Sequence, residues 1–395
     1  MSATPVLICA WARSAVVPVD GAFRALHAHD IAAPTVQALL QRAGVPASAV
    51  DAMVMGNALG AGGNPARMAA LAAGLPDHCP AFTIDSQCCS GLDAVGTAAN
   101  MIAIGQAHVV IAGGAEAWSR APIRHHRPKH ANESAVAYER PAFAPDPTRD
   151  PDLLQASALY AQQHQFSRAQ QNVYSQQSHA RALQHQAALQ AHIVPIAGVT
   201  HDAYPRAIAD DKLHRIPLAT SLENNHSDID CGVSQLAVSV KADGAAFVLL
   251  MSQSACQQLG CEPKAQWLAH TSAGCAPDMP LLAAQVAAQA VLKRAVWTTV
   301  HTLQAVELHD AFAVQGMSFN QALSMSTDIC NTYGGGLARG HPIGASGAVA
   351  LVQLLTRLSL STHNEPTGLV AIAAAGGLGS AALVYSLKDD AAFTC

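Results

Sequence analysis

Two adjacent cysteines stand in the stretch TIDSQCCSGLDAVGTAANMI (83–102), between a strand-like run and a helix-like run. A cysteine at such a turn lies where the amide groups and the positive end of the helix dipole converge, which lowers the thiol pKa and favours the thiolate. Ser90 and Gly91 are small and leave room for a substrate. A lone buried cysteine is more often inert packing. The interpretation of Cys88 as a nucleophile therefore depends on residues that could meet it.

One such residue is His341, in YGGGLARGHPIGASG (333–347). The glycines of this segment permit tight turns and close backbone approach, and Pro342 restricts the turn just before the next helix. A histidine held in this way can take a proton from a thiol and return it to a leaving group.

A second histidine ends a strand-like segment. His309 closes AVELH (305–309), and Asp310 after it is typical of a helix N-cap. Near the C-terminus, AAAGGLGSA (373–381) offers backbone amides that could stabilise an oxyanion together with the amide of the nucleophile. By itself, that segment fits a hairpin turn equally well.

Alternating strand-like and helix-like segments position these residues in two similar halves. Residues 1–120 alternate strands with helices, and the alternation resumes at 263. In each half a reactive residue precedes Ser-Gly, a helix follows, and an apolar strand runs into Gly-Gly. The pattern predicts an α/β fold of two duplicated αβα units that face each other.

The segment between the halves differs in composition. Residues 121–232 are rich in Gln, His, Pro and Arg and contain one convincing helical segment, at about 153–191. We expect an inserted loop region that covers the substrate and lies over the first half. The predicted domains are 1–120, rejoined by about 233–252, then the insertion at 121–232, and finally 253–395.

Composition excludes several classes of partner. The net charge of −5 argues against a nucleic acid held by phosphate contacts, and no apolar run is long enough to span a bilayer. The ten cysteines show no CxxC pair and the N-terminus no clear secretion signal, so we expect reduced thiols and a cytoplasmic protein. The histidine-rich RHHRPKH (124–130) lacks the spacing of a metal site, so no metal is expected.

Taken together, the motifs resemble the thiolase family, within the thiolase and ketoacyl-synthase superfamily. They stand in the family's order along nearly the whole chain: MGNALGAGGNPARMAALAAGLP, CCSGLDAV, VVIAGGAEAWSRAP, FSRAQQNVYSQQSHARAL, KADGAAFVLLMS, HDAFAVQ and GGGLARGHPIGASG. The resemblance implies a five-layered αβαβα fold and a coenzyme A thioester as substrate, without a separate cofactor. It also implies a homodimer or homotetramer.

The resemblance assigns catalytic roles. Cys88 matches the cysteine that is acylated in thiolases, and His341 matches the residue that activates it. His309 falls where most thiolases carry asparagine, in a version of the motif similar to the sterol-carrier-type branch. There it would help to bind the thioester oxygen in a first oxyanion hole.

The resemblance also implies binding groups. Backbone N–H groups of Cys88 and of the turn at Ala375 and Gly376 would form a second oxyanion hole. Ser239 aligns with a serine that approaches the pantetheine arm, and Phe312 is assigned to the substrate-binding site.

The sequence departs from the family at informative positions. Thiolases normally carry a second cysteine, which acts as acid and base at the α-carbon, where this chain has Ala373. Ala375 replaces a glycine, and Cys89 stands where glycine is usual. The usual histidine-methionine pair of the insertion aligns loosely with Asp152 and Leu153.

These features predict a thiolase-like acyl-CoA acyltransferase that forms or cleaves a C–C bond through an acyl-enzyme thioester on Cys88. The set Cys88, His309 and His341 is also similar to the Cys-His-His site of decarboxylating ketoacyl synthases, where loss of CO₂ generates the carbanion. Three alternatives therefore stay open. They are a decarboxylating enzyme that uses an acyl-CoA or an acyl carrier, an acyl transfer to oxygen or nitrogen, and an impaired partner subunit of a thiolase-fold complex.

Overall fold

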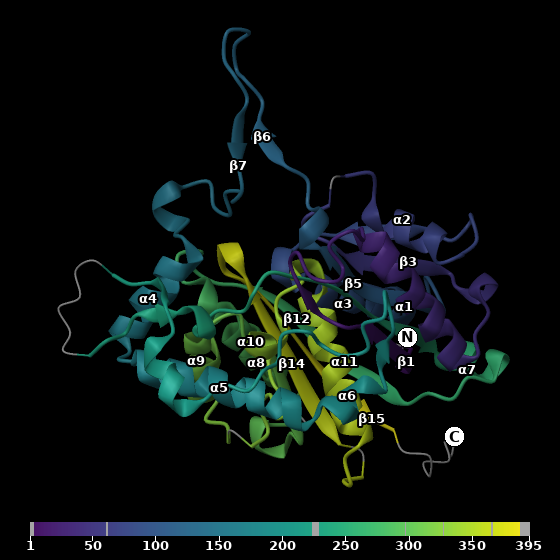
Figure 1. Ribbon diagram of the computed structural model, residues 1–395. Coiled ribbons are helices and arrows are strands. Elements are labelled where there is room, and N and C mark those ends of the chain that lie inside the picture. Colours follow the sequence, from purple (N-terminus) through teal and green to yellow (C-terminus); the bar gives the residue numbers. More distant parts are fainter. Residues whose placement is uncertain are drawn as a thin grey trace.

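A computed structural model describes residues 4–60, 62–222, 229–296, 298–326, 328–364 and 366–387. Its main feature is a mixed sheet in the order β13-β14-β15-β12-β1-β11-β5-β3-β4, to which β2 and β8 add at β11 and β1 (Figure 1). The strands are β1 (Val6–Ser14), β2 (Val17–Pro18), β3 (Ala52–Gly56), β4 (Ala81–Ile84), β5 (Val109–Ala117), β8 (Ile193–Val194), β11 (Ala242–Ser252), β12 (Ala265–Gly274), β13 (Ala305–His309), β14 (Thr367–Ala374) and β15 (Leu378–Ser386).

The sheet has two halves, which join where β1 pairs with β12. In the first half, β3 is parallel to β4 and β5, and β11 runs antiparallel between β5 and β1. In the second half, β13 is parallel to β14, and β15 runs antiparallel between β14 and β12. Strand β11 follows the insertion in sequence, so the chain returns to the first half before it builds the second.

Helices cover both faces of this sheet. Three apolar cores hold five layers together, and the second core lies on both sides of the central helices. In the first, α1 and α2 pack on one face of β1, β3, β5 and β11. In the second, α3 and α11 lie between the two halves. In the third, α8 and α9 pack on the outer face of β13, β14 and β15. The helices are α1 (Ala28–Ala43), α2 (Pro65–Ala72), α3 (Ser90–Ala103), α8 (Ala283–Arg294), α9 (Ala313–Ala322) and α11 (Ser346–Ser359). The predicted five-layered αβαβα fold is confirmed.

The insertion departs from prediction in two respects. In place of one helical segment at about 153–191, the chain forms α4 (Leu153–Gln163), α5 (Arg168–Gln184) and α6 (Gln186–Gln190). A new helix begins because Ser167 caps α5 in a capping box with Gln170, after Gln165 has turned the chain at a φ of 56°.

The insertion also packs elsewhere than expected. Helix α5 lies against α9 and α10 (Gly336–Arg339) of the second half, whereas β8 pairs with β1 of the first, so the insertion covers both halves and not the first alone. Hydrogen bonds from α5 to the second half explain this position. Ser178 of α5 accepts a hydrogen bond from the amide of Gly335, and Tyr174 donates one to Asp310. These hydrogen-bond partners could not be predicted from the sequence pattern.

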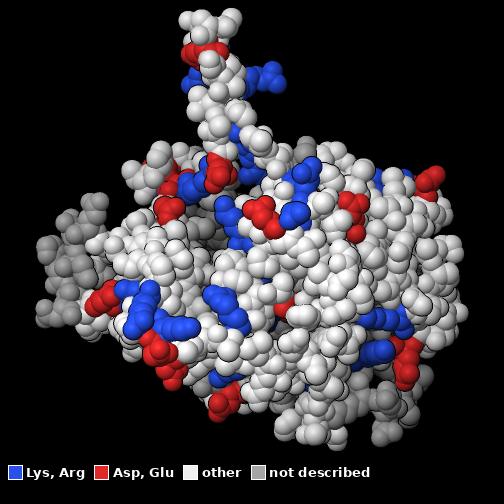
Figure 2. Space-filling view, viewed as in Figure 1, with Lys and Arg blue, Asp and Glu red and all other residues white. Residues whose placement is uncertain are grey.

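Two short hairpins complete the insertion. Strands β6 (Arg124–His126) and β7 (Val136–Tyr138) form an arm that projects far from the body of the protein (Figure 1). Strands β9 (Leu218–Thr220) and β10 (Val233–Ser234) pair beside α4. On the face that Figure 2 shows, acidic and basic side chains are interspersed, and the surface is hollowed at the base of the projecting arm. In the described parts of the chain, no helix has the length and apolar character needed to cross a membrane.

Candidate active site

Cys88 lies in the turn that connects β4 to α3. The turn Gln87–Cys89 is a short 3₁₀ segment that runs directly into α3. Gln87, just before the nucleophile, has a φ of 54°, a conformation that non-glycine residues rarely adopt. The hydroxyl of Ser90 accepts a hydrogen bond from the amide of Ser86 and donates one to the carbonyl of Gln87. These two bonds hold the strained backbone that presents Cys88.

The corresponding turn of the second half packs directly against it. The carbonyl oxygen of Gly344 would lie 2.8 Å from a Cβ placed on Gly91 and 2.1 Å from one placed on Gly114. Any larger residue at these two positions would push the turns apart. The glycines thus allow the two reactive segments to meet.

The meeting of the turns brings a thiol to an imidazole. The Sγ atom of Cys88 lies 3.2 Å from Nε2 of His341. The hydroxyl of Ser346 donates to the carbonyl of Pro342 at 3.0 Å, so its oxygen is free to accept from Nδ1–H of His341 at 2.7 Å. This hydrogen-bond pattern places the imidazole proton on Nδ1 and leaves Nε2 as an acceptor that faces the thiol.

Both groups of this pair are neutral at neutral pH. Burial raises the pKa of the Cys88 thiol to about 12, although the backbone N–H groups of Ala375 and of Cys88 itself act in the opposite direction. Burial lowers the pKa of His341 to about 4. The expectation of a lowered Cys88 pKa is therefore wrong for the resting site, because removal from water outweighs the amides of the turn.

His309 completes a compact group. Strand β13 ends at this residue, and its ring stacks on that of His341 with 4.4 Å between the ring centroids. Its Nε2 is buried and has no hydrogen-bond partner among the described residues. Burial, His341 and Arg339 all lower the pKa of His309, so the ring is neutral. In the tautomer that carries its proton on Nε2, this neutral imidazole can donate a hydrogen bond to a substrate oxygen.

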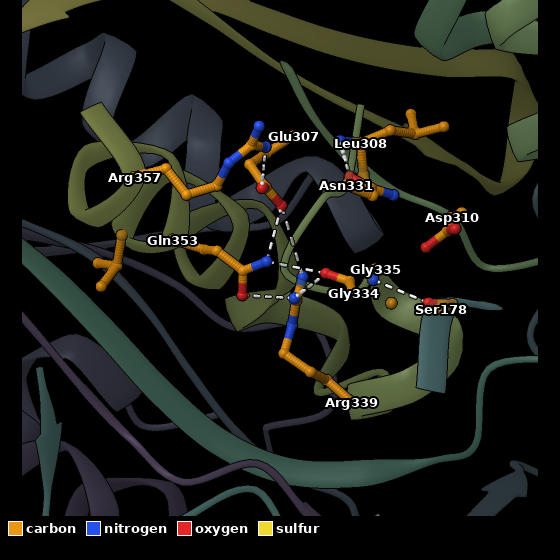
Figure 3. A network of polar contacts seen from close by, with 12 residues as sticks. Ser178, Glu307, Leu308, Asp310, Asn331, Gly334, Gly335, Arg339, Gln353 and Arg357 are labelled. Atoms are coloured by element: carbon orange, nitrogen blue, oxygen red, sulfur yellow. Dashed lines mark hydrogen bonds and ion pairs between the residues drawn. The ribbon is translucent and has the colours of Figure 1, made fainter. Parts of the chain in front are cut away.

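A buried polar network fixes the segments that carry both histidines (Figure 3). Glu307, two residues before His309, accepts hydrogen bonds from Arg357 and from Gln353, the latter at 3.0 Å. Arg339, two residues before His341, donates to the carbonyl of Gly334 and to Gln353. Gln353 and Arg357 both belong to α11, and these side chains are at most 8% exposed. The helix thereby holds both histidine segments in one arrangement.

Further hydrogen bonds tie β13 to the loop before α10. Asn331 exchanges two hydrogen bonds of 2.9 Å with the backbone of Leu308. Asp310 accepts from the amide of Leu337 and from Tyr174. The prediction that Asp310 caps the next helix is wrong, because α9 begins only at Ala313, with Phe312 in the N-cap position. Its carboxylate instead accepts the hydrogen bonds from Leu337 and Tyr174.

Glu116 links the first half to the His341 turn. Its buried carboxylate accepts hydrogen bonds from the side chain of Asn57 and from the amides of Ala58 and Gly344. Burial raises the pKa of Glu116 to about 7, and those amides partly offset the effect. Sequence reasoning missed this residue and the network around Glu307. A charged residue inside an apolar strand was the signal that could have revealed each of them.

Comparison with known proteins identifies the chain. Residues 6–254 match the model of the thiolase N-terminal domain, and residues 261–386 match that of the thiolase C-terminal domain. The chain belongs to the thiolase family. This result confirms the resemblance, and the protein is accordingly a thiolase-like acyltransferase.

Individual thiolase relatives cover almost the whole chain. The putative acetyl-CoA C-acetyltransferase VraB of Staphylococcus aureus (strain COL) is 34% identical over 386 residues, which are 95% of this chain and 98% of that protein. The acetyl-CoA acetyltransferase of Shinella zoogloeoides is 32% identical over 401 residues, covering 97% and 100%. The crystal structure of the Acat5 thiolase from Ascaris suum in complex with coenzyme A has a TM-score of 0.87 and 25% identity, and the match covers 97% of this chain and 100% of that one.

The remaining residues assigned from the thiolase pattern lie around this group. The amide of Ala375 hydrogen-bonds to the sulfur of Cys88. Gly376 lies next in the same turn, where a Cβ would come within 2.9 Å of the carbonyl oxygen of Phe143. The hydroxyl of Ser239 donates to the carbonyl of Gly336 at 2.7 Å, beside the His309 ring. Phe312 is 8% exposed and packs in a cluster with Tyr160 and Leu281.

The residues that depart from the thiolase pattern contribute to core packing or to helix capping. Ala373 packs in the core beneath α8 and brings no titratable group. Cys89 is 1% exposed, and its sulfur lies 3.7 Å from the carbonyl oxygen of Ile372. Asp152 caps α4 through the amides of Leu154 and Gln155, and Leu153 packs near Phe312. In the parts of the chain that the structure describes, no cluster of His, Cys, Asp and Glu residues has metal-binding geometry.

Proposed function

We propose that this thiolase-family protein transfers an acyl group from a coenzyme A thioester to Cys88 and then forms or cleaves a C–C bond beside a thioester. The observation that carries the proposal is the 3.2 Å contact between Sγ of Cys88 and Nε2 of His341. A neutral thiol needs a base within hydrogen-bond reach at the moment of attack, and the geometry supplies one.

The first half-reaction follows from this pair. Nε2 of His341 takes the thiol proton as sulfur attacks the thioester carbonyl. The oxyanion that develops accepts hydrogen bonds from the amides of Cys88 and Ala375, which already face the sulfur. Coenzyme A then leaves as a thiol with the proton from His341, and the acyl group remains on Cys88.

The second half-reaction needs a carbanion or enolate at the α-carbon of the other substrate. In the tautomer with a proton on Nε2, His309 would donate a hydrogen bond to the oxygen of that enolate, because this atom has no partner among the described residues. Ala373 cannot remove an α-proton, so we expect only weak thiolysis of acetoacetyl-CoA. Thiolysis at a rate matching that of acyl-enzyme formation would contradict this part of the proposal.

Intact-protein mass spectrometry tests the acyl-enzyme directly. The wild type, exposed to a panel of acyl-CoAs with and without malonyl-CoA, should gain the mass of the acyl group. The Cys88→Ala variant should gain none. Cys89→Ala is the matched control, because it removes the neighbouring thiol and should still be acylated. If Cys88→Ala is acylated like the wild type, the proposal fails. If the folded wild type is not acylated at all, the chain is an impaired partner subunit.

Decarboxylative condensation is a second candidate, favoured by one observation. Two neutral imidazoles stack at the nucleophile, while the position of the second thiolase cysteine is occupied by Ala373. Loss of CO₂ from a malonyl thioester would generate the carbanion without a base. Release of labelled CO₂ from malonyl-CoA by the wild type, abolished in His309→Ala, would support this route. Product mass then separates C–C bond formation from acyl transfer to oxygen or nitrogen.

The proposal includes a homo-oligomer in the cytoplasm. Strand β4 lies at the end of the sheet, with Phe82 46% exposed on it and Met68 and Leu71 exposed on the adjacent α2. An exposed edge strand with apolar neighbours is suited to pair with a second copy. The nine described cysteines are free thiols, as in a reducing compartment. Light scattering should give a multiple of the chain mass, and Phe82→Asp should shift it toward the monomer.

A further inference from the structure

Three thiols share one buried site beneath α7 (Gln253–Leu259), apart from Cys88. Cys9 is on β1, Cys256 is on α7 and Cys261 follows that helix. The Sγ atoms of Cys9 and Cys256 are 3.4 Å apart. The side chain of Cys261 interacts with Cys9 and raises its pKa. The three side chains are 1%, 6% and 6% exposed and belong to the same apolar core.

The backbone brings these thiols together through two irregularities. Strand β1 pairs with β11 in regular register except between Ile8 and Ala10, so Cys9 is the extra residue of a β-bulge. Bulges re-aim side chains and are common next to functional sites. On the other side, Gly260 ends α7 at a φ of 60°, and the amide of Cys261 donates to the carbonyl of Cys256 at 2.9 Å. The end of α7 and the bulge of β1 therefore bring their cysteines into the same apolar core.

The site lies close to solvent despite its burial. Cys256 and Cys261 have exposed neighbours in the chain, namely Gln257, Gln258, Gly260 and Glu262. The helix has only seven residues and sits at the junction between the matched N-terminal (6–254) and C-terminal (261–386) thiolase domains. Short surface helices open locally at low free energy, which admits a small oxidant.

The thiols also differ in protonation. Hydrogen bonding among the three thiols raises the pKa of Cys9 and lowers that of Cys256. The same hydrogen bonding, with attraction to Lys264, lowers the pKa of Cys261 to about 7 against the effect of burial. A substantial fraction of Cys261 is therefore thiolate at neutral pH, and thiolates are the form that hydroperoxides oxidise.

We propose that Cys9, Cys256 and Cys261 form a hydroperoxide-sensitive disulfide site in which Cys9 is the shared partner. The Cys261 sulfur attacks the peroxide, an S–O bond forms, the O–O bond breaks, and the released alkoxide or hydroxide takes a proton. Cys9 attacks the resulting sulfenic acid and gives its proton to the departing hydroxide. The S–S bond forms, the S–O bond breaks, and hydroxide leaves as water. In total, two thiols and ROOH yield a disulfide, ROH and water. Cys256 can enter by thiol-disulfide exchange with Cys9.

A disulfide at this site joins segments far apart in the chain. Cys9 and Cys256 are separated by 247 positions, and disulfides that close long loops restrict the unfolded chain most. Oxidation should therefore raise the Tm of the full-length protein. The site contains none of the groups assigned to acyl transfer, so the proposal stands whether or not Cys88 is acylated.

The test uses the wild-type protein and hydrogen peroxide. After removal of reductant, peroxide treatment and alkylation with iodoacetamide in denaturant, peptide mass spectrometry should find Cys9 linked to Cys256 or Cys261, and dithiothreitol should reverse the link and the rise in Tm. Cys79 is an internal control, because it is fully buried and its sulfur contacts the carbonyl of Pro80. If the three thiols are alkylated as completely as Cys79 after peroxide, the proposal is overturned.

Variants then assign the roles. Cys9→Ser should form no link, and peroxide should no longer change its Tm. Cys261→Ser should form the Cys9–Cys256 link more slowly than the wild type, and Cys256→Ser should form the Cys9–Cys261 link at a rate close to that of the wild type. A link of Cys256 to Cys261 that persists in Cys9→Ser would refute the role of Cys9. Because the wild-type experiment is decisive by itself, a variant that does not fold leaves the conclusion intact.

Discussion

The two reactive turns are built alike but are held differently. In each half a 3₁₀ turn runs into a helix of 14 residues that begins with serine: Gln87–Cys89 into α3, and Ile343–Ala345 into α11. Both serines donate to a carbonyl within their own turn. The first, Ser90, accepts from a backbone amide, whereas the second, Ser346, accepts from the ring of His341.

The side-chain contacts that hold the two turns in place differ more than the turns themselves. The first turn is held by the strained Gln87 and by Asp93, which accepts a hydrogen bond from Ser86 and lies 3.2 Å from Nε2 of His270 near the surface. The second is held by the charged network of Glu307, Arg339 and Arg357, which is almost completely buried. The same local structure thus positions a sulfur through a partly buried carboxylate with several hydrogen bonds and an imidazole through almost fully buried charges. We infer that the imidazole needs the more exact orientation.

Removal of the base should have the largest effect. In His341→Ala the neutral Cys88 loses its proton acceptor, so acyl-enzyme formation should slow by about 10²–10⁴-fold. Quenched-flow mass spectrometry with a reactive acyl-CoA measures this rate. An unchanged rate would mean that another group deprotonates Cys88.

Breaking the anchor of the second turn should have the next largest effect. Arg339→Met leaves Glu307 and Gln353 partly unpaired, so both histidines should lose their fixed orientation and acylation should slow by about 10–100-fold. Stability should also fall, by about 3–5 kcal/mol, as for other broken buried pairs. Arg339→Lys should recover part of the rate.

Arg13→Met is a matched control for this variant. It breaks a buried ion pair of 2.6 Å with Asp202, which bonds to neither histidine segment. Its stability should fall similarly while the acylation rate of the folded protein stays close to that of the wild type. Equal loss of rate in both variants would show that Arg339 acts through stability alone.

The serines that begin α3 and α11 provide a further test of the difference between the two turns. Ser346→Ala removes the acceptor that fixes the proton of His341 on Nδ1, so kcat should fall by about 10-fold with little change in KM, as for other orienting partners. Ser90→Ala removes bonds to backbone atoms of the Cys88 turn and should leave the pH dependence of acylation unchanged. If both variants show the same pH profile and the same kcat, the assigned tautomer has no catalytic effect.

The smallest expected effect concerns how the alkylation and acylation of Cys88 depend on pH. The pKa of Cys88 is raised to about 12, so its alkylation by iodoacetamide should continue to rise above pH 9, whereas an ordinary cysteine levels off near its pKa of about 8.5. On the acid side, His341 becomes protonated only near its pKa of about 4, so acylation should stay constant from pH 7 to 5 and fall below that range. A plateau of alkylation at pH 8 would show that the resting site holds a thiolate.

The sequence predicted the elements whose apolar pattern is strong. Strand β13, which ends at His309, and the helices after both reactive turns lie where the sequence pattern predicted them. β12 was not predicted. Its sequence AQWLAHTSAG mixes polar and apolar side chains, and most of them are only half-buried, so alternation is weak.

Side-chain electrostatics were the harder part of the site. Proximity of Cys88, His341 and His309 followed from motifs, and the structure brings all three together. The raised pKa of Cys88 did not follow, because it depends on how completely the second half shields the turn from water. The partners of Glu307 did not follow either, since they come from a helix about fifty residues further along the chain. The boundaries at 120, 232 and 252 stay predictions.

The burial of α11 limits how this protein can be divided. Thirteen consecutive residues of that helix, Ser346 to Leu358, are shielded from solvent, wedged between strands of both halves. If the chain were cut in the exposed connection after α7, the C-terminal fragment would carry an uncovered apolar helix, and the N-terminal fragment would lack the surface that normally covers α3. Each piece alone should aggregate, and only co-expression should yield soluble, complementing fragments.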